Sequence, residues 1–539
     1  MEENMPDLII NTLSALSVKY IFHLPGTPLK SMYDSLSRQK QIKSVLFKHE
    51  QAACFAAAGY ALVTNQPGIC MVMNGPGVTN TISAVSECYF QSIPLVIITA
   101  DNPQKDLGIE SFHEVDTFTM LRPVTKKIII PHNAKEIQQA VVEALSTATE
   151  GRPGPVYLNI PMSLMTKTAS LKKIRIKKKD FKATAAEAAK ALHYIESSRD
   201  PVIFAGSGIK RGNAEKELAE FVSLTGIPVF TSLGGRGAFP EGSHLSLGMM
   251  PFNFDPHFLS MSDLCIVLGA RLNPVNLRMG RLKLPEKIVR VDIDNENPRN
   301  RIADFFIRSD IRMFLRVLNQ KIKKSKSFSK HSESSIYKIY RKEYDTFASA
   351  EYENELKKTK ELTTKKFLLE LAAFLDKRQA TIFSDSIWIP FSHFLPKAKR
   401  AKSFFSMNNF GCLGFALPSA IGAAFAEKRK KTISLSGDGA FLFNCQELST
   451  AATYGLKNFI QIIFNNDGYS IIYNSARRMY KRQHEYYSWN SIDYSGFARS
   501  LGVKAITVDS ANKINGALQQ AFTGKGPFVI NVIARDESS

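Results

Sequence analysis

Residues 434–441 read Ser-Leu-Ser-Gly-Asp-Gly-Ala-Phe, and residues 464–470 read Phe-Asn-Asn-Asp-Gly-Tyr-Ser. Each stretch ends a short apolar run, 431–436 and 459–464, of the kind that predicts a buried strand, and a helix is expected over 441–454 between them. The pattern predicts a βαβ unit whose two loops lie at the carboxyl ends of parallel strands. Ligands of open parallel sheets bind at that edge.

The residue types in these two loops suit a diphosphate held by a metal ion. Gly437 and Gly439 allow the backbone to approach a phosphate, and the N–H groups that enter the helix at Ala440 can donate hydrogen bonds to it. Three protein oxygens, two phosphate oxygens and a water would complete an octahedral Mg²⁺ site. The expected protein ligands are Asp438, Asn466 and the carbonyl of Gly468. Either loop alone is more typical of an ordinary turn, whereas the pair, each after a buried strand, indicates a site.

Length and composition place the chain among large globular proteins. At 539 residues it exceeds what one core supports, and three domains are expected. Its N-terminus is acidic, and no apolar run reaches membrane-spanning length, so we expect a cytoplasmic protein. The six cysteines show no C-x-x-C pairing and are expected to be reduced core residues.

The net charge of +21 indicates either an anionic partner or simply a lysine-rich surface. Two basic clusters, 172–182 and 321–330, fall where linkers are expected. Neither cluster alternates with aromatic residues, and no nucleic-acid-binding motif is present, so we expect neither nucleic-acid nor membrane partners.

The distribution of apolar runs predicts three α/β domains in a row, each a mostly parallel sheet with helices on both faces. We expect an N-terminal domain over 1–170, a central domain over 186–335 and a C-terminal domain over 355–539. Linkers are expected at 171–184 and 321–335. No internal repeat is visible.

With these motifs laid out, the chain resembles the acetolactate synthase and 2-oxo acid decarboxylase branch of the thiamine-diphosphate (ThDP) enzymes. The resemblance covers nearly the full length and keeps the family's order of motifs. The matching segments are His49-Glu50-Gln51-Ala52-Ala53, Asn74-Gly75-Pro76-Gly77, Phe112-His113-Glu114, Gly151-Arg152-Pro153-Gly154-Pro155, Leu268-Gly269-Ala270-Arg271, Gly411-Cys412-Leu413-Gly414, and the two loops quoted above.

The resemblance implies pyrimidine-binding, central and diphosphate-binding domains, with ThDP and Mg²⁺ held between subunits of a homodimer or homotetramer. It implies that Glu50 activates the cofactor by bonding its pyrimidine ring, although a glutamate that begins a helix also has a purely structural explanation in the helix dipole. Leu413 would bend the cofactor, and the Gly411 carbonyl would accept from its amino group. Further cofactor contacts are implied for Pro25, Gly26, Asn80, Ser386, Ile387 and Tyr469.

Several substrate-side positions depart from the acetolactate synthase pattern. His113 stands where the synthases carry glutamine and is a candidate catalytic residue, with a surface or helix-packing histidine as the alternative. Val275 stands where they carry the arginine that holds the second substrate, and the next arginine is Arg278. The run 386–389, Ser-Ile-Trp-Ile, replaces a Gly-Gln-His run.

Three functions follow from these observations. The first is a carboligase that decarboxylates a 2-oxo acid such as pyruvate and transfers the acyl carbanion to a second carbonyl. The second is a simple decarboxylase that releases an aldehyde, and the third is a non-catalytic scaffold subunit. FAD, which the synthases hold in the central domain, is left open: Leu268-Gly269-Ala270-Arg271 and Val291-Asp292-Ile293-Asp294 are compatible with it, whereas the absence of the synthases' short acidic stretch after Arg271 argues against it. Gly206-Ser-Gly208 is, taken alone, a weak dinucleotide hint, because a third glycine at the required spacing is missing.

Overall fold

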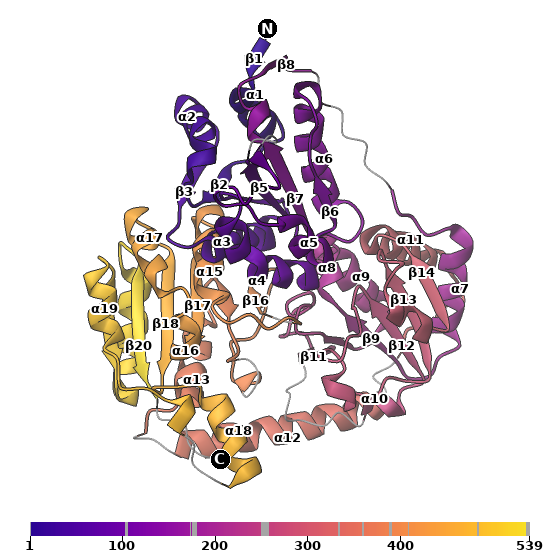
Figure 1. Cartoon of the computed structure of the whole chain (residues 1–539). Helices are drawn as coiled ribbons and strands as arrows, with labels where there is room; N and C mark the ends of the chain where they lie inside the picture. Colours follow the sequence, from indigo (N-terminus) through magenta and orange to yellow (C-terminus); the bar gives the residue numbers. More distant parts are fainter. Residues whose placement is uncertain are drawn as a thin grey trace.

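The computed structural model describes residues 2–102, 106–172, 174, 180–249, 258–331, 335–357, 361–387, 391–407, 409–481 and 485–534. Three six-stranded sheets follow one another along this part of the chain, and the strand pairs within each of them are parallel (Figure 1). Helices cover both faces of the sheets. The predicted class, three consecutive α/β domains, is confirmed.

The N-terminal sheet has the strand order β3-β2-β4-β5-β7-β6. Its strands are β2 (Tyr20–His23), β3 (Lys43–Leu46), β4 (Gly68–Met71), β5 (Leu95–Asp101), β6 (Lys127–Ile129) and β7 (Pro155–Pro161). The main helices are α1 (Met5–Ala15), α2 (Lys30–Arg38), α3 (Glu50–Thr64), α4 (Pro76–Gln91), α5 (Thr117–Leu121) and α6 (Ile137–Thr149). One face packs on α1 and α6 and the other on α3 and α4, which gives the domain two separate apolar cores. A short antiparallel pair, β1 (Glu2–Asn4) and β8 (Thr168–Ser170), joins the two ends of the domain.

The middle sheet has the order β11-β10-β9-β12-β13-β14. Its strands are β9 (Pro201–Ala205), β10 (Val229–Thr231), β11 (Ser246–Met249), β12 (Leu264–Leu268), β13 (Lys287–Asp292) and β14 (Phe305–Arg308). The helices are α7 (Ala185–Glu196), α8 (Ser207–Arg211), α9 (Glu215–Thr225), α10 (Phe258–Met261) and α11 (Ile311–Lys324). A long helix, α12 (Ser335–Lys357), then crosses from the middle domain toward the C-terminal domain (Figure 1).

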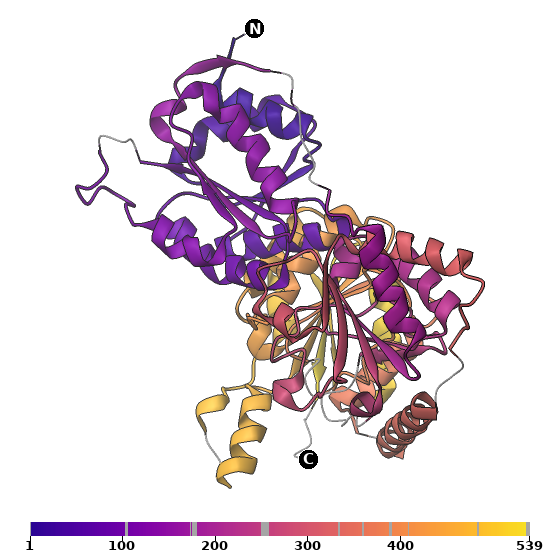
Figure 2. The same cartoon turned by 90° about the vertical axis from the view of Figure 1, so that its right-hand side faces the viewer.

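The C-terminal sheet has the order β16-β15-β17-β18-β20-β19. Its strands are β15 (Ala380–Ser384), β16 (Phe404–Ser406), β17 (Lys431–Gly437), β18 (Phe459–Asn465), β19 (Lys504–Val508) and β20 (Phe528–Ile533). The helices are α13 (Thr364–Leu375), α15 (Ala416–Ala426), α16 (Asp438–Phe441), α17 (Leu448–Thr453), α18 (Ser470–Tyr480), α19 (Tyr494–Ser500) and α20 (Ile514–Thr523). Helix α18 projects from the body of this domain (Figure 2).

The N-terminal and C-terminal sheets share one topology. Numbered within each domain, both place their strands in the order 2-1-3-4-6-5, a repeat that the sequence does not reveal. In both domains the helix after the second strand, α3 or α15, covers the same position. These two equivalent helices pack against each other and join the domains into one apolar core.

Two glycines allow α3 and α15 to approach to backbone contact. A Cβ on Gly59 would lie 2.0 Å from the carbonyl oxygen of Ser419, and a Cβ on Gly422 would lie 1.9 Å from that of Ala56. The alanine-rich sequence of both helices, which buries small residues on several sides, is explained by this close approach.

Two expectations about local structure need correction, the second only in part. The helix expected over 441–454 is divided into α16, a 3₁₀ turn at Cys445–Glu447 and α17. The break occurs where the Asn444 side chain donates to the Gly414 carbonyl (2.9 Å), so that a distant loop docks at this point. The linker expected at 321–335 agrees with residues 325–331, which form no helix or strand, but 321–324 are the last turn of α11 and Ser335 already begins α12.

None of the described helices has both the length and the apolar content needed to cross a lipid bilayer.

We expect Gly59→Ala to lower the midpoint of thermal unfolding, because its Cβ would meet backbone that cannot move independently. Overpacking of this kind typically destabilises by about 1–3 kcal/mol. The matched control is Gly516→Ala in α20, where an added Cβ meets no atom within 4 Å. The control should unfold at the same or a higher temperature than the wild type. Equal midpoints for the two variants would contradict the role given to Gly59.

Candidate functional site

Glu50 begins α3, directly after the carboxyl end of β3. Its side chain is 8% exposed, and its Oε2 accepts a hydrogen bond from Nδ2 of Asn80 at 3.0 Å. Oε1 faces Gly77, where an added Cβ would lie 3.7 Å away. Asn80 lies inside α4, one turn after the helix begins, so the two helices together orient a nearly buried carboxylate. Such a carboxylate can stabilise a protonated ring nitrogen of a bound ligand.

Pro25, Gly26 and His113 lie on neighbouring loops of the same domain. Gly26 packs against Met73, whose Cβ would be 2.5 Å from a Cβ on that glycine. His113 has a left-handed backbone (φ 67°), and its carbonyl approaches Gly75. Both ring nitrogens of His113 are buried and, within the described structure, have no hydrogen-bond partner. The hydrogen-bonding capacity of this ring is therefore unused within the described structure.

Asp438 lies at the carboxyl end of β17 and is fully buried. Its Oδ1 accepts from the Gly439 N–H at 2.9 Å, and its Oδ2 accepts from the Gly468 N–H at 3.2 Å. Burial raises the pKa of this carboxyl to about 7, although hydrogen bonds from neighbouring N–H groups oppose the shift. The two loops singled out in the sequence are thus joined through one carboxylate.

The glycines around Asp438 have different roles. A Cβ on Gly437 would meet no atom within 4 Å, so this residue leaves open space for a ligand. A Cβ on Gly439 would lie 2.5 Å from the Tyr469 ring, which packs edge-on against Trp489 with ring centroids 5.2 Å apart. Gly439 is needed for the packing of Tyr469, and Gly437 provides the access.

The oxygen chemistry of this loop pair fits a hard cation. Asn466 donates from Nδ2 to Oγ of Ser470 at 2.8 Å, which orients its amide. Ala440 is nearly buried behind Asp438. Among the described residues, no group of three or more His, Cys, Asp and Glu side chains forms a metal cluster. A site of one carboxylate, one amide and one carbonyl, completed by diphosphate oxygens, is consistent with that finding.

The loop 411–414 carries Gly411 and Leu413 into the space between the N-terminal and C-terminal domains. Gly411 has a positive φ of 81°, and a Cβ there would meet no atom within 4 Å. Leu413 is half-buried against the core that the two domains share. The loop therefore combines an open backbone with an apolar side chain, as the bending of a two-ring cofactor requires.

Three buried polar side chains, which the sequence analysis did not single out, hold this loop in place. Asp385 accepts from the N–H groups of Phe415 (3.0 Å) and Ala416 (3.2 Å) and from Oγ of Ser436 (2.8 Å). Burial raises the pKa of Asp385 to about 7. The only sign of this role in the sequence is that Asp385 directly follows the apolar run that forms β15.

The other two are Asn444, described above, and Glu87. Glu87 on α4 is fully buried, and its Oε2 accepts from the Cys412 N–H at 2.9 Å. The loop is therefore fastened by side chains of both domains.

Two residues shortly after β15, both expected to contact the cofactor, differ in burial. Ser386 is half-buried, whereas Ile387 is 5% exposed and belongs to the C-terminal core. Trp388 and Ile389 lie outside the described residues.

On the substrate side, Val275 packs against the apolar core of the C-terminal domain. Arg278 is 6% exposed and electrostatically close to Tyr340 of α12. Both residues line a cavity of only about 40 Å³. Arg278 is thus fixed within the packing of the middle domain.

A larger cavity, about 680 Å³, lies between the N-terminal and middle domains at the carboxyl ends of β9, β12 and β13. Its wall includes Gly208, Arg152 and Arg271, and both arginines approach Oδ2 of Asp294, at 3.9 and 3.2 Å. A glycine turn and two arginines at strand ends are suited to a nucleotide diphosphate.

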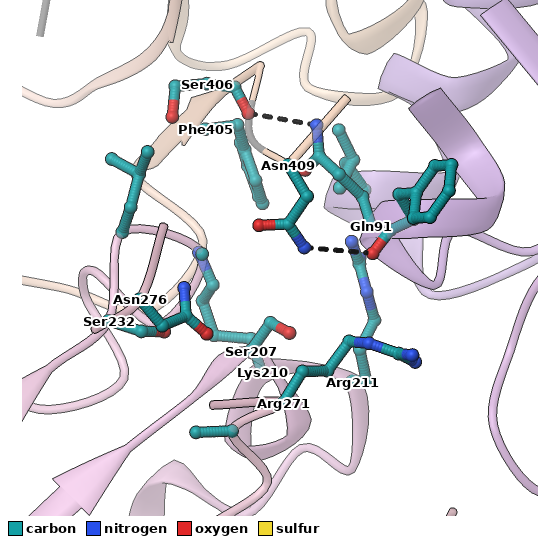
Figure 3. Close-up of a pocket in the computed structure, with 15 residues that line it drawn as sticks. Gln91, Ser207, Lys210, Arg211, Ser232, Arg271, Asn276, Phe405, Ser406 and Asn409 are labelled. Atoms are coloured by element: carbon teal, nitrogen blue, oxygen red, sulfur yellow. Dashed lines mark hydrogen bonds between the residues drawn. The ribbon is translucent and has the colours of Figure 1, made fainter. Parts of the chain in front are cut away.

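All three domains meet beside this cavity (Figure 3). Gln91 donates to the Ser406 carbonyl (3.1 Å), and Asn409 donates to the Phe90 carbonyl (3.4 Å). Lys210 donates to the Phe404 carbonyl (3.2 Å), and burial lowers its pKa to about 7. These hydrogen bonds connect the three domains at the junction and fix their relative positions.

Comparison with protein families shows three matches in chain order. The N-terminal thiamine-pyrophosphate-binding domain of thiamine pyrophosphate enzymes matches residues 3–120. The central domain of the same enzymes matches residues 188–318, and their C-terminal binding domain matches residues 390–532.

Individual proteins are similar over nearly the whole chain. A probable acetolactate synthase large subunit of Methanocaldococcus jannaschii is 31% identical, with 98% of this chain and 91% of the relative aligned. That of Methanococcus aeolicus is 31% identical over 99% and 92%. Acetolactate synthase 2, chloroplastic, of Nicotiana tabacum is 28% identical over 98% and 81%.

Proposed function

The chain belongs to the thiamine-diphosphate enzymes, in the branch of the acetolactate synthase large subunits, and from this premise we propose that it is a Mg²⁺-dependent carboligase. It would decarboxylate a 2-oxo acid such as pyruvate and join the remaining acyl unit to a second carbonyl compound. The observation that carries the proposal is the buried Asp438 carboxylate, which joins the two loops beside the open backbone of Gly437.

The residues of the chain fit ThDP and Mg²⁺. When bound, ThDP supplies a carbon nucleophile that adds to a 2-oxo acid and accepts the electron pair released with carbon dioxide. Asp438, Asn466 and the Gly468 carbonyl would hold Mg²⁺ against the diphosphate. Glu50, oriented by Asn80, would hold a proton at a pyrimidine nitrogen. In this proposal Pro25, Gly26, Leu413 and Tyr469 line the cofactor, and His113 faces the substrate.

Replacing Asp438 by Asn should weaken ThDP binding in the presence of Mg²⁺ by about a hundredfold or more, because a charged metal ligand is lost while the side-chain shape is kept. Calorimetric titration of ThDP measures the change. Asp376→Asn, which removes an exposed carboxylate paired with Lys399, is the matched control. Unchanged affinity in Asp438→Asn would remove the metal assignment.

The Glu50→Gln variant should retain ThDP and lose about 10²–10⁴-fold in turnover, the usual range for one acid–base group. Glutamine can still accept from Asn80 but does not stabilise a protonated ring. Hydrogen–deuterium exchange at C2 of the bound cofactor measures the activation step itself. Glu143→Gln, at an exposed ion pair with Lys127, is the control. Exchange in Glu50→Gln as fast as in the control would show that Glu50 is not the activating group.

The choice of acceptor follows from Val275 and Arg278. A charged 2-oxo acid acceptor needs a partner for its carboxylate, and a bidentate arginine is best suited to this role. The structure has an apolar contact at Val275 and holds Arg278 beside Tyr340. These features favour an aldehyde acceptor, or a proton, which gives the simple decarboxylase as the second candidate.

We therefore expect pyruvate with 2-oxobutyrate to give little acetohydroxybutyrate, whereas pyruvate with an aldehyde gives an acyloin at least as fast. Mass-spectrometric product analysis distinguishes these outcomes. Val275→Arg should increase use of the 2-oxo acid acceptor, while Val275→Leu should not. Efficient acetohydroxybutyrate formation by the wild type would contradict the expectation, and its loss in Arg278→Ala would then assign the carboxylate contact to Arg278.

We also propose that the cavity of about 680 Å³ holds the dinucleotide of FAD, with Arg152 and Arg271 beside its phosphates. Its volume is in the range of cofactor sites. Protein purified after growth should then release flavin on denaturation, and Arg152→Ala/Arg271→Ala should release less. Flavin-free protein that takes up none from added FAD would contradict this proposal.

A homo-oligomer is proposed on the basis of exposed apolar side chains beside the site. Phe112 is 87% exposed next to His113, and Phe410 is 48% exposed next to Gly411. Association with a second copy would cover such side chains. A cytoplasmic location is proposed because all six cysteines are free, which suits a reducing compartment.

A further inference from the structure

A basic groove lies between the N-terminal and C-terminal domains, away from the candidate site. It encloses a cavity of about 790 Å³. The cationic and aromatic residues that line it include Tyr20, Lys43, Phe425, Lys428, Arg429, Lys431, Tyr454 and Lys457. Lys43 begins β3 and Lys431 begins β17, so the groove opens at the amino ends of the strands. The ThDP residues lie at the opposite, carboxyl ends.

The charged side chains that line the groove are all positive. Lys43, Lys428, Arg429, Lys431 and Lys457 line it and have no ion-pair partner among the described residues. The remaining cation, Lys430, is paired with Glu427 at 2.9 Å. No carboxylate of the described chain lines the cavity. Five uncompensated positive charges around one space favour a polyanion.

Lys431 shows how the site is built. Its Nζ donates to the carbonyls of Lys457 (2.8 Å) and Ala521 (3.3 Å), which hold the ammonium group in a half-buried position without neutralising it. Burial lowers the pKa of Lys431. An anion in the groove would remove this unfavourable burial of charge.

The groove lies at the C-terminal end of α15, and cations are expected there. A helix macrodipole places about half a negative charge at its C-terminus. That accounts for one lysine or arginine and leaves most of the positive charge without a structural explanation.

Aromatic rings form the other wall of the groove. Phe425 lies between Tyr20 and Tyr454, with ring centroids 5.4 and 5.5 Å apart. Tyr454 is 37% exposed, and its hydroxyl accepts from the Leu46 N–H at 2.8 Å. Aromatic faces beside phosphate-binding cations are the usual elements of recognition of a nucleobase with its phosphates.

We propose that this groove binds a nucleoside polyphosphate. The phosphates lie among Lys428, Arg429, Lys431 and Lys457, and the base packs on the aromatic wall. The cavity exceeds the size of such a ligand, and its position lets one ligand contact both domains. Figure 1 shows β3 beside α17, the two elements that flank the groove. The proposal is independent of the reaction that the ThDP site carries out.

The test is calorimetric titration of ATP into the full-length protein saturated with ThDP and Mg²⁺. The groove variant is Lys428→Glu/Arg429→Glu. Both side chains are exposed, and both residues follow the end of α15, away from the loops that carry the ThDP residues. The control is Lys338→Glu/Lys342→Glu, which makes the same change of charge on exposed residues of α12. Both variants are first checked for an unchanged thermal midpoint.

We expect the wild type and the control to bind ATP alike and the groove variant to bind at least about tenfold more weakly, because two charge-assisted contacts are replaced by repulsion. Binding should weaken as salt rises. Inorganic tripolyphosphate should compete with ATP but bind more weakly, since it lacks the base. Absence of ATP binding overturns the proposal. So does equal binding by the groove variant and the control, which would place ATP outside this groove, and so does tripolyphosphate binding as tightly as ATP.

Discussion

The backbone contact between α3 and α15 is the constraint on which the rest of the structure depends. The helices occupy equivalent positions in two domains of the same topology. Glycine at positions 59 and 422 lets the backbones of the two helices come into direct contact. Because Glu50 begins one of these helices and the loop 411–414 leads into the other, their packing fixes where the chain holds each of these two segments. Bulkier residues at positions 59 and 422 would force the two helices apart.

A second feature is a set of buried carboxylates that hold loops in place by accepting backbone hydrogen bonds. Asp385, Glu87 and Asp438 are fully buried, and burial of a charge is unfavourable unless hydrogen bonds compensate for it. Each accepts at least one backbone N–H, and together they connect two strand ends with the loop 411–414. For Asp385 and Asp438 the raised pKa shows that the compensation is incomplete. A bound cation would complete it at Asp438, whereas Asp385 is explained by the geometry that it maintains.

Much of the local structure could be predicted from the sequence. The apolar runs that predicted strands at 431–436 and 459–464 agree with β17 and β18 within one residue. These strands are buried on both sides, so their composition alone separates them from loops. The break after Phe441 could not be predicted, because it depends on Gly414, which reaches Asn444 only in the folded chain. The same is true of the hydrogen bond from Asn80 in α4 to Glu50, because the two helices meet only in the folded chain.

The sequence by itself determined the order of the three α/β units and which residue types follow each strand, because strand burial and loop chemistry are written in consecutive residues. It also carried the motifs that indicate a ThDP enzyme. Only the tertiary structure decided that the first and last domains share a topology, that Asp385 and Glu87 support the loop of Leu413, and that Val275 faces an apolar core. It also brought the lysines of two domains around one groove. These features join residues hundreds of positions apart, and their energies arise only once burial and close packing have brought the side chains together.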